Sequence, residues 1–291
     1  MQAIHPLRAR NVRRTPFRIA TPAPGTMRMN LLLTFGLAYL AFAAFAYFVS
    51  DRLIFLPPPA TYRPERLRVF PVRTEDGVSI AVLHLPRREA AYTVLYSHGN
   101  GEDLGMALPA LEALRQAGFA VLAYDYRGYG ASEGGPPTAD GAYLDIRAAY
   151  RYATAELGIP PSRIVVYGYS VGTGPSVELA AREPVGGLVV ENGFVSTFRV
   201  LTGVPLLPFD KFPNLRTIRR VGCPVLVIHA MRDEVIPFSH GRRLFEAAPE
   251  PKRALWVEGA GHTNVAAVAG ERYWSVLRSF TQLLEQAAPA R

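Results

Sequence analysis

The sequence predicts an α/β protein in which a mostly parallel β-sheet is covered by helices on both faces, preceded by one transmembrane helix. Two observations carry this prediction. From about residue 60 onward, short continuous apolar runs alternate with amphipathic stretches, as in parallel sheets buried on both sides. Ahead of them, residues 29–50 are apolar throughout, with no charged residue between Arg28 and Asp51.

The apolar stretch is long enough to cross a bilayer. At 1.5 Å per residue, its 22 residues span roughly 30 Å, the thickness of the hydrocarbon core. Pro57-Pro58-Pro59 follows and favours an extended chain. We therefore expect a basic cytoplasmic tail over 1–28, a transmembrane helix over 29–50, a linker over 51–64 and one globular domain over 65–291.

Two other interpretations of this stretch were weighed. A helix that is apolar on every face could be buried in a soluble core, but nothing upstream could cover it. It could also be a cleaved signal peptide, because Ala41-Phe42-Ala43 and Ala44-Phe45-Ala46 fit the small-x-small cleavage preference. The stretch is longer than the usual apolar region of a signal peptide, about 7–15 residues, which favours an uncleaved anchor.

The basic residues before the apolar stretch predict its orientation. Residues 1–50 hold six Arg and no acidic residue, which favours an N-terminus in the cytoplasm and a globular domain outside it, in the periplasm or a lumen. The six are Arg8, Arg10, Arg13, Arg14, Arg18 and Arg28.

The globular part reads as strands and helices in near-regular alternation. A turn at 75–77 separates two strands of antiparallel type, and the later strands alternate with helices. The expected strands are 67–73, 78–85, 93–97, 119–124, 163–167, 187–190, 225–229 and 254–257. The expected helices are 104–117, 139–157, 171–182, 237–247 and 271–286.

Charge and composition exclude several classes of function. The formal net charge is +8, but residues 51–291 hold 26 basic and 24 acidic residues, so the globular part is close to neutral and a nucleic-acid partner is not expected. The single Cys223 rules out an intrachain disulfide. Neither a metal-ligand spacing nor a dinucleotide or P-loop motif is present, so we expect no metal and no cofactor.

One motif predicts a nucleophile. Gly168-Tyr169-Ser170-Val171-Gly172 follows the predicted strand 163–167 and opens a helix. In such a strand–turn–helix elbow the central residue is held in a strained conformation, and its flanking glycines avoid collisions. The motif therefore predicts that the hydroxyl of Ser170 is lifted above the sheet.

A serine hydroxyl needs a base, and the base needs an acid to fix its tautomer. His262, in the Gly-rich loop after the last strand, is the expected base. Asp233 follows strand 225–229 and is the expected acid, giving the chain order Ser, Asp, His. Glu191, after the preceding strand, is the other credible acid, and Glu234 is a neighbour with which Asp233 could be confused.

Acyl transfer also needs donors for the developing oxyanion. The backbone N–H of Val171, next to the nucleophile, is one candidate. The loop His98-Gly99-Asn100-Gly101 offers a second, for which we choose the N–H of Asn100, and His98 is expected to orient the loop.

These pieces resemble a known family. LYSHGNGED, AYDYRGYGASEG, VVYGYSVGTG, VVENGF, VLVIHAMRDEVIPF and EGAGHTN are similar, in this order, to the α/β-hydrolase domain-containing serine hydrolases, from about residue 65 to the end. The segment RLIFLPPPATY after the apolar helix also resembles the membrane-anchored members. The resemblance implies the α/β-hydrolase fold and the triad Ser170, Asp233 and His262. Two positions depart from the family pattern. Gly101 stands where a small residue such as Ala is usual, and Ala230 stands where Gly is usual.

The expected protein is a membrane-anchored serine hydrolase. We expect it to cleave a carboxylic ester or thioester through an acyl-enzyme, on a small-molecule or lipid-like acyl substrate. A peptidase or amidase that uses the same triad remains open. So does a non-catalytic anchored scaffold with a hydrolase fold.

Overall fold

A computed structural model of the chain describes residues 24–287. The chain divides into two units between Tyr47 and Phe48, which are described separately. The described part of the first unit belongs to helix α1 (Pro24–Ile54). The apolar section of α1, Arg28–Ile54, has a mean hydropathy of 2.0, and residues 28–42 are all exposed. It is long and apolar enough to cross a membrane.

The bounds of α1 differ from those predicted. The helix begins before residue 29 and continues past Asp51 and Arg52, because neither residue breaks a helix and the first proline comes only at Pro57. Residues 1–23 of the predicted basic tail, with five of its six arginines, lie outside the described residues.

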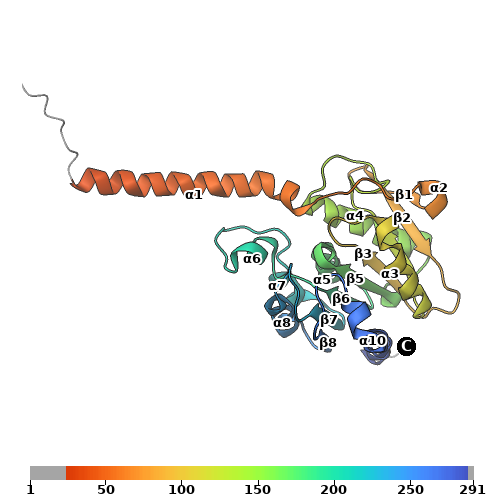
Figure 1. Cartoon of the computed structure of the whole chain (residues 1–291). Coiled ribbons are helices and arrows are strands. Elements are labelled where there is room, and N and C mark those ends of the chain that lie inside the picture. Colours follow the sequence, from red (N-terminus) through yellow and green to blue (C-terminus); the bar gives the residue numbers. More distant parts are fainter. Residues whose placement is uncertain (1–23, 288–291) are drawn as a thin grey trace, which may run out of the picture. The chain divides into compact units, whose positions relative to one another are not determined.

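The second unit is built on an eight-stranded sheet (Figure 1) in the order β1-β2-β4-β3-β5-β6-β7-β8. β2 pairs antiparallel with β1 and β4, and all other pairs are parallel, as the sequence predicts. The strands are β1 (Phe70–Arg73), β2 (Ser79–Leu85), β3 (Thr93–Ser97), β4 (Ala120–Tyr124), β5 (Ile164–Tyr169), β6 (Gly187–Glu191), β7 (Val225–Ala230) and β8 (Lys252–Val257).

Helices cover both faces of this sheet, so its central strands are buried on both sides. Alternate residues of one strand serve opposite cores: Val166 packs with α4 (Ala139–Arg151), α5 (Thr173–Arg182) and α8 (Phe238–Ala247), whereas Tyr167 packs with α3 (Leu104–Gln116) and α10 (Glu271–Ala287). This two-sided burial is the reason that β3 to β7 read as continuous apolar runs.

Several short helices of the structure have no recognisable signal in the sequence. Each has six residues or fewer, too short for a periodic pattern to emerge. The α-helices are α2 (Pro64–Leu67), α6 (Thr197–Thr202), α7 (Asn214–Thr217) and α9 (Val265–Ala269), with 3₁₀ turns η2 (Pro161–Arg163), η3 (Ser170–Gly172) and η4 (Ile218–Arg220). The predicted helix 139–157 ends in a π-helical turn, η1 (Tyr152–Glu156), and α2 takes the start of the predicted strand 67–73.

Residues 51–62, most of the predicted linker, are built into the second unit. The ring of Phe55 is 3% exposed and packs edge-on against Tyr126, Tyr129 and Phe212. Asp51 Oδ2 pairs with Lys211 Nζ at 3.0 Å. The chain that leaves α1 is thus packed into the second unit before it enters the sheet.

Candidate active site

Ser170 occupies a strained turn between β5 and α5. Its φ is +53°, in the left-handed region that a residue with a side chain rarely adopts. The turn depends on Gly168 and Gly172, because a Cβ on Gly168 would lie 2.6 Å from Gly172 O and one on Gly172 would lie 2.1 Å from Ser97 O. No larger residue fits at either position, which explains the glycines of the motif.

The structure brings Ser170, His262 and Asp233 together although they are far apart in the sequence. His262 Nε2 lies 2.9 Å from Ser170 Oγ, and His262 Nδ1 lies 2.8 Å from Asp233 Oδ2. The three follow β5, β8 and β7, whose carboxyl ends meet at one edge of the sheet. Ser170 and His262 are 8% and 7% exposed, so the pair is largely shielded from water.

The geometry fixes the proton on His262. An ionised Asp233 can only accept, so His262 Nδ1 donates to it and Nε2 is left to accept from the hydroxyl of Ser170. Burial alone would raise the pKa of Asp233, but the hydrogen bonds from His262 and the backbone N–H groups of Val235 and Ile236 outweigh it and lower that pKa. Asp233 therefore stays ionised at neutral pH.

The other acids considered have different partners. Glu191 is buried and accepts hydrogen bonds from the hydroxyls of Tyr167 and Tyr273. Its burial raises the pKa of the carboxyl, which the two tyrosines only partly offset. Glu234 Oε2 accepts from the backbone N–H of His262 at 3.1 Å and so holds the histidine loop. The acid that hydrogen-bonds the imidazole of His262 is Asp233.

Two further residues that the sequence analysis missed hold the histidine loop. Asn192 Nδ2 donates to His262 O at 2.6 Å, while its Oδ1 accepts from the N–H of Ala230 at 2.9 Å, so one amide ties β7 to that loop. Tyr169 Oη also donates to His262 O, at 3.1 Å. Asn192 has φ +47°, and an asparagine before a glycine at a strand end is the only signal the sequence offered.

The two predicted oxyanion donors follow neighbouring strands that pair in matching register. Ser97 of β3 pairs with Gly168 of β5, and Asn100 and Val171 each follow three residues later. The carbonyl of Ser97 lies against Gly172, so the two loops touch. The side chain of Asn100 is held as well, since its Oδ1 accepts from the N–H of Leu56 and from Tyr129 Oη, each at 2.8 Å.

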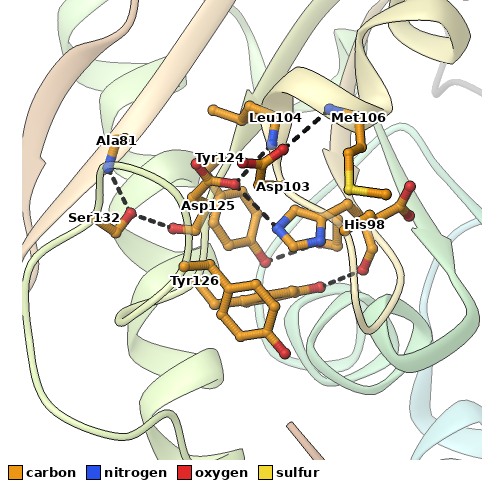
Figure 2. Close-up of polar contacts among 12 residues, drawn as sticks. Ala81, His98, Asp103, Leu104, Met106, Tyr124, Asp125, Tyr126 and Ser132 are labelled. Atoms are coloured by element: carbon orange, nitrogen blue, oxygen red, sulfur yellow. Dashed lines mark hydrogen bonds and ion pairs between the residues drawn. The ribbon is translucent and has the colours of Figure 1, made fainter. Parts of the chain in front are cut away.

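A buried ion pair supports the loop that carries Asn100 (Figure 2). His98 Nε2 lies 3.4 Å from Asp125 Oδ1, and both side chains are fully buried. Burial alone would lower the pKa of His98, but the carboxylate of Asp125 outweighs it and raises that pKa. Asp125 Oδ1 also accepts from the N–H of Leu104, and Tyr126 Oη donates to His98 O, each close to 2.8–2.9 Å. His98 therefore orients the loop, as the sequence predicts.

Over residues 24–287 no group of three or more His, Cys, Asp or Glu side chains is arranged to hold a metal ion. Cys223 is buried, and burial raises the pKa of its thiol to about 12, so it is not a nucleophile at neutral pH.

Comparison with known proteins identifies this fold. A family model described as the α/β-hydrolase fold matches residues 92–209. The esterase Pf2001 of Pyrococcus furiosus superimposes with a TM-score of 0.65 at 22% identity, covering 78% of this chain and 98% of the esterase. The chain thus has the α/β-hydrolase fold, and its class is that of the α/β hydrolases.

The relatives narrow the class to a family. The human alpha/beta hydrolase domain-containing protein 17B is 36% identical over 268 residues, covering 82% of this chain and 91% of the relative. The alpha/beta hydrolase domain-containing protein aho-3 of Caenorhabditis elegans is 40% identical over 223 residues, covering 75% and 65%. This chain belongs to the alpha/beta hydrolase domain-containing protein family.

Proposed function

We propose that this protein is a serine hydrolase that cleaves a carboxylic ester or thioester through an acyl-enzyme. The observation that supports it best is the continuous hydrogen-bonded chain from Ser170 Oγ through His262 to Asp233. Each link has the distance and the donor–acceptor order that nucleophilic catalysis needs.

The reaction follows from this chain of contacts. Ser170 Oγ attacks the acyl carbon while His262 Nε2 takes its proton, and Asp233 stabilises the imidazolium that forms. The N–H groups of Val171 and Asn100 receive the oxyanion of the tetrahedral intermediate. His262 then gives the proton to the leaving alcohol or thiol. Water, activated by the same imidazole, hydrolyses the acyl-serine and restores the enzyme.

Turnover of p-nitrophenyl esters of increasing chain length tests this proposal, with a thioester and a peptide p-nitroanilide beside them. The expected result is ester and thioester cleavage that Ser170→Ala reduces to background. Cleavage of the peptide substrate alone would favour the peptidase alternative. Failure of the whole substrate panel would favour a non-catalytic scaffold.

We further propose that α1 anchors the enzyme in a membrane, with its N-terminus in the cytoplasm and the hydrolase domain on the other side. The six arginines before the apolar stretch 29–50 support this orientation. An alkaline phosphatase fusion after Leu56 should be active, and an active cytoplasmic reporter at the same point would reverse the orientation. The intact mass of the purified protein tests for signal cleavage, which after Ala46 would remove most of α1.

An acyl substrate delivered from the bilayer fits such an anchor. A soluble variant that tests this must begin at residue 48, because Asp51, Phe55 and Leu56 are part of the hydrolase domain. Removal of residues 1–47 should reduce the hydrolysis of long-chain esters in vesicles more than that of short soluble esters. Equal losses on both substrates would argue against delivery from the membrane.

A further inference from the structure

A pocket outside the proposed triad lies between α6 and the α7–η4 segment. It encloses about 280 Å³ and is lined by Val195, Ser196, Arg199, Asp210, Pro213, Leu215, Arg216 and Arg219. Three of these eight residues are arginines and one is an acid, so the lining is strongly positive.

The arginines of this pocket have no acidic partner. Within residues 24–287, no carboxylate lies within 4.0 Å of the guanidinium groups of Arg199, Arg216 or Arg219. Asp210 Oδ1 instead accepts from the backbone N–H groups of Phe198 and Lys211, each at 2.9 Å. The positive charge of the pocket is therefore not neutralised from within.

Buried polar atoms at the pocket lack partners as well. Ser196 is 3% exposed, and its Oγ makes no hydrogen bond. The same holds for Arg199 Nε, which is also buried. Because a buried polar atom without a hydrogen-bond partner is destabilising, Ser196 Oγ and Arg199 Nε at one pocket point to a bound group that satisfies them.

The pocket lies close to the point where the chain leaves α1. Asp210 lines the pocket, and its neighbour Lys211 pairs with Asp51 in the last turn of α1. The loop that joins α6 to Asp210 exposes Val204 and Leu206, each 53% exposed. The pocket is positive, and the loop that joins two of its lining segments exposes apolar side chains. These two features match the two parts of a phospholipid, a charged head group and its acyl chains.

We propose that this pocket binds the phosphate group of an anionic phospholipid, with the acyl chains against Val204 and Leu206. Planar guanidinium groups suit phosphate because they donate paired hydrogen bonds to its oxygens. Ser196 supplies a hydroxyl donor at the same place. The site holds the hydrolase domain against the bilayer surface, and it rests on the proposal that α1 is a membrane anchor.

The test uses the full chain with Ser170→Ala in non-ionic detergent, so that the probes are not hydrolysed and binding is measured independently of catalysis. Isothermal titration calorimetry compares three probes. Dihexanoyl phosphatidylglycerol carries phosphate and chains, inorganic phosphate carries no chains, and dihexanoylglycerol carries no phosphate. Arg219→Ala is matched by Arg220→Ala, which removes the same charge from an exposed neighbour that does not line the pocket.

We expect phosphatidylglycerol to bind more tightly than either of the other probes, and Arg219→Ala to weaken it at least tenfold while Arg220→Ala changes it less than twofold. Val204→Ser should also weaken the binding of phosphatidylglycerol, while any binding of inorganic phosphate should stay unchanged. If inorganic phosphate bound as tightly as phosphatidylglycerol, the pocket would be a site for free phosphate, and the proposal of a phospholipid ligand would be wrong. Equal losses in the two arginine variants, or equal binding of dihexanoylglycerol, would overturn the site itself.

Since the binding assay contains no functional Ser170, its outcome is separate from that of the esterase assay. Lipid binding without ester turnover would contradict the proposed hydrolase and leave this site standing. Ester turnover without Arg219-dependent lipid binding would contradict this site and leave the proposed hydrolase standing.

Discussion

The backbone N–H of Leu56 donates a hydrogen bond of 2.8 Å to Asn100 Oδ1, and so ties the chain just after α1 to the loop of the proposed oxyanion hole. Tyr129 Oη donates to the same oxygen. Two donors from separate segments thus hold the side chain of Asn100. The backbone N–H of the same residue is proposed to stabilise the transition state.

Replacing Asn100 with Ala should lower kcat about tenfold with little change in KM. The backbone N–H remains, but both donors lose their acceptor, so the loop is held less firmly against a charge that develops only in the transition state. Steady-state kinetics on a short p-nitrophenyl ester measure this, with the exposed Gln282→Ala as the control. An unchanged kcat would show that the side-chain contacts of Asn100 do not hold this loop for catalysis.

Asn192→Asp should reduce kcat by about tenfold or more. The aspartate tolerates the positive φ at this position but cannot donate to His262 O, which leaves a buried carbonyl facing a carboxylate. Asn214→Asp is the matched control, because Asn214 Nδ2 also donates to a buried carbonyl, Phe194 O at 3.0 Å. If both variants lose stability but only Asn192→Asp loses kcat, the amide positions His262. Equal losses of kcat in the two variants would show that Asn192 stabilises the fold and does not specifically position His262.

Asp233→Asn and Glu191→Gln test which of the two candidate acids orients His262. Asp233→Asn should lower kcat by about 10³–10⁴-fold, because His262 would be held in the wrong tautomer. Glu191→Gln keeps an acceptor for Tyr167 and Tyr273 and should keep kcat within a few-fold. Kinetics at pH 7 with both variants give the answer, and the opposite ranking would make Glu191 the acid.

His240 should make the protein less stable in mild acid. Its burial, with the charges of Arg243, His229 and Arg199 nearby, lowers the pKa of the imidazole to about 4 from an ordinary value of 6.5. Between these values the unfolded chain binds a proton that the folded chain does not, so stability is fully present above pH 6.5 and falls as the pH drops toward 4.

His240→Asn keeps an acceptor for the N–H of Val195 and removes the titration. The melting temperature should then fall less between pH 7 and pH 5 than it does in the unchanged protein. Only this difference is informative, because the substitution also changes packing at both pH values. An identical fall in both proteins would contradict the role of His240.

The sequence predicted the sheet because its central strands are buried on both faces and therefore read as unbroken apolar runs. It predicted Ser170 because steric demands at Gly168 and Gly172 leave a visible motif. It could not predict the packing of residues 51–62, since three prolines suggest an extended chain whether or not that chain touches anything. Phe55 becomes buried only through residues far away in the sequence.

Residues that position the site were the hardest to predict. The link from Asn192 to His262 and Ala230 joins three segments through one amide, and no local pattern encodes it. Glu234 is similar, because its contact with the N–H of His262 depends on how two loops meet at the sheet edge. Such residues emerge only from the three-dimensional structure.

The most direct test of the proposed hydrolase is covalent labelling with a fluorophosphonate, followed by peptide mapping. Serine hydrolases react because the hydroxyl is activated by its base, so the adduct reports the activated chain itself and requires no known substrate. We predict one adduct, on Ser170, that is lost in both Ser170→Ala and His262→Ala proteins of unchanged melting temperature. Labelling that persists in Ser170→Ala, or a folded protein that takes up no label, would contradict the account.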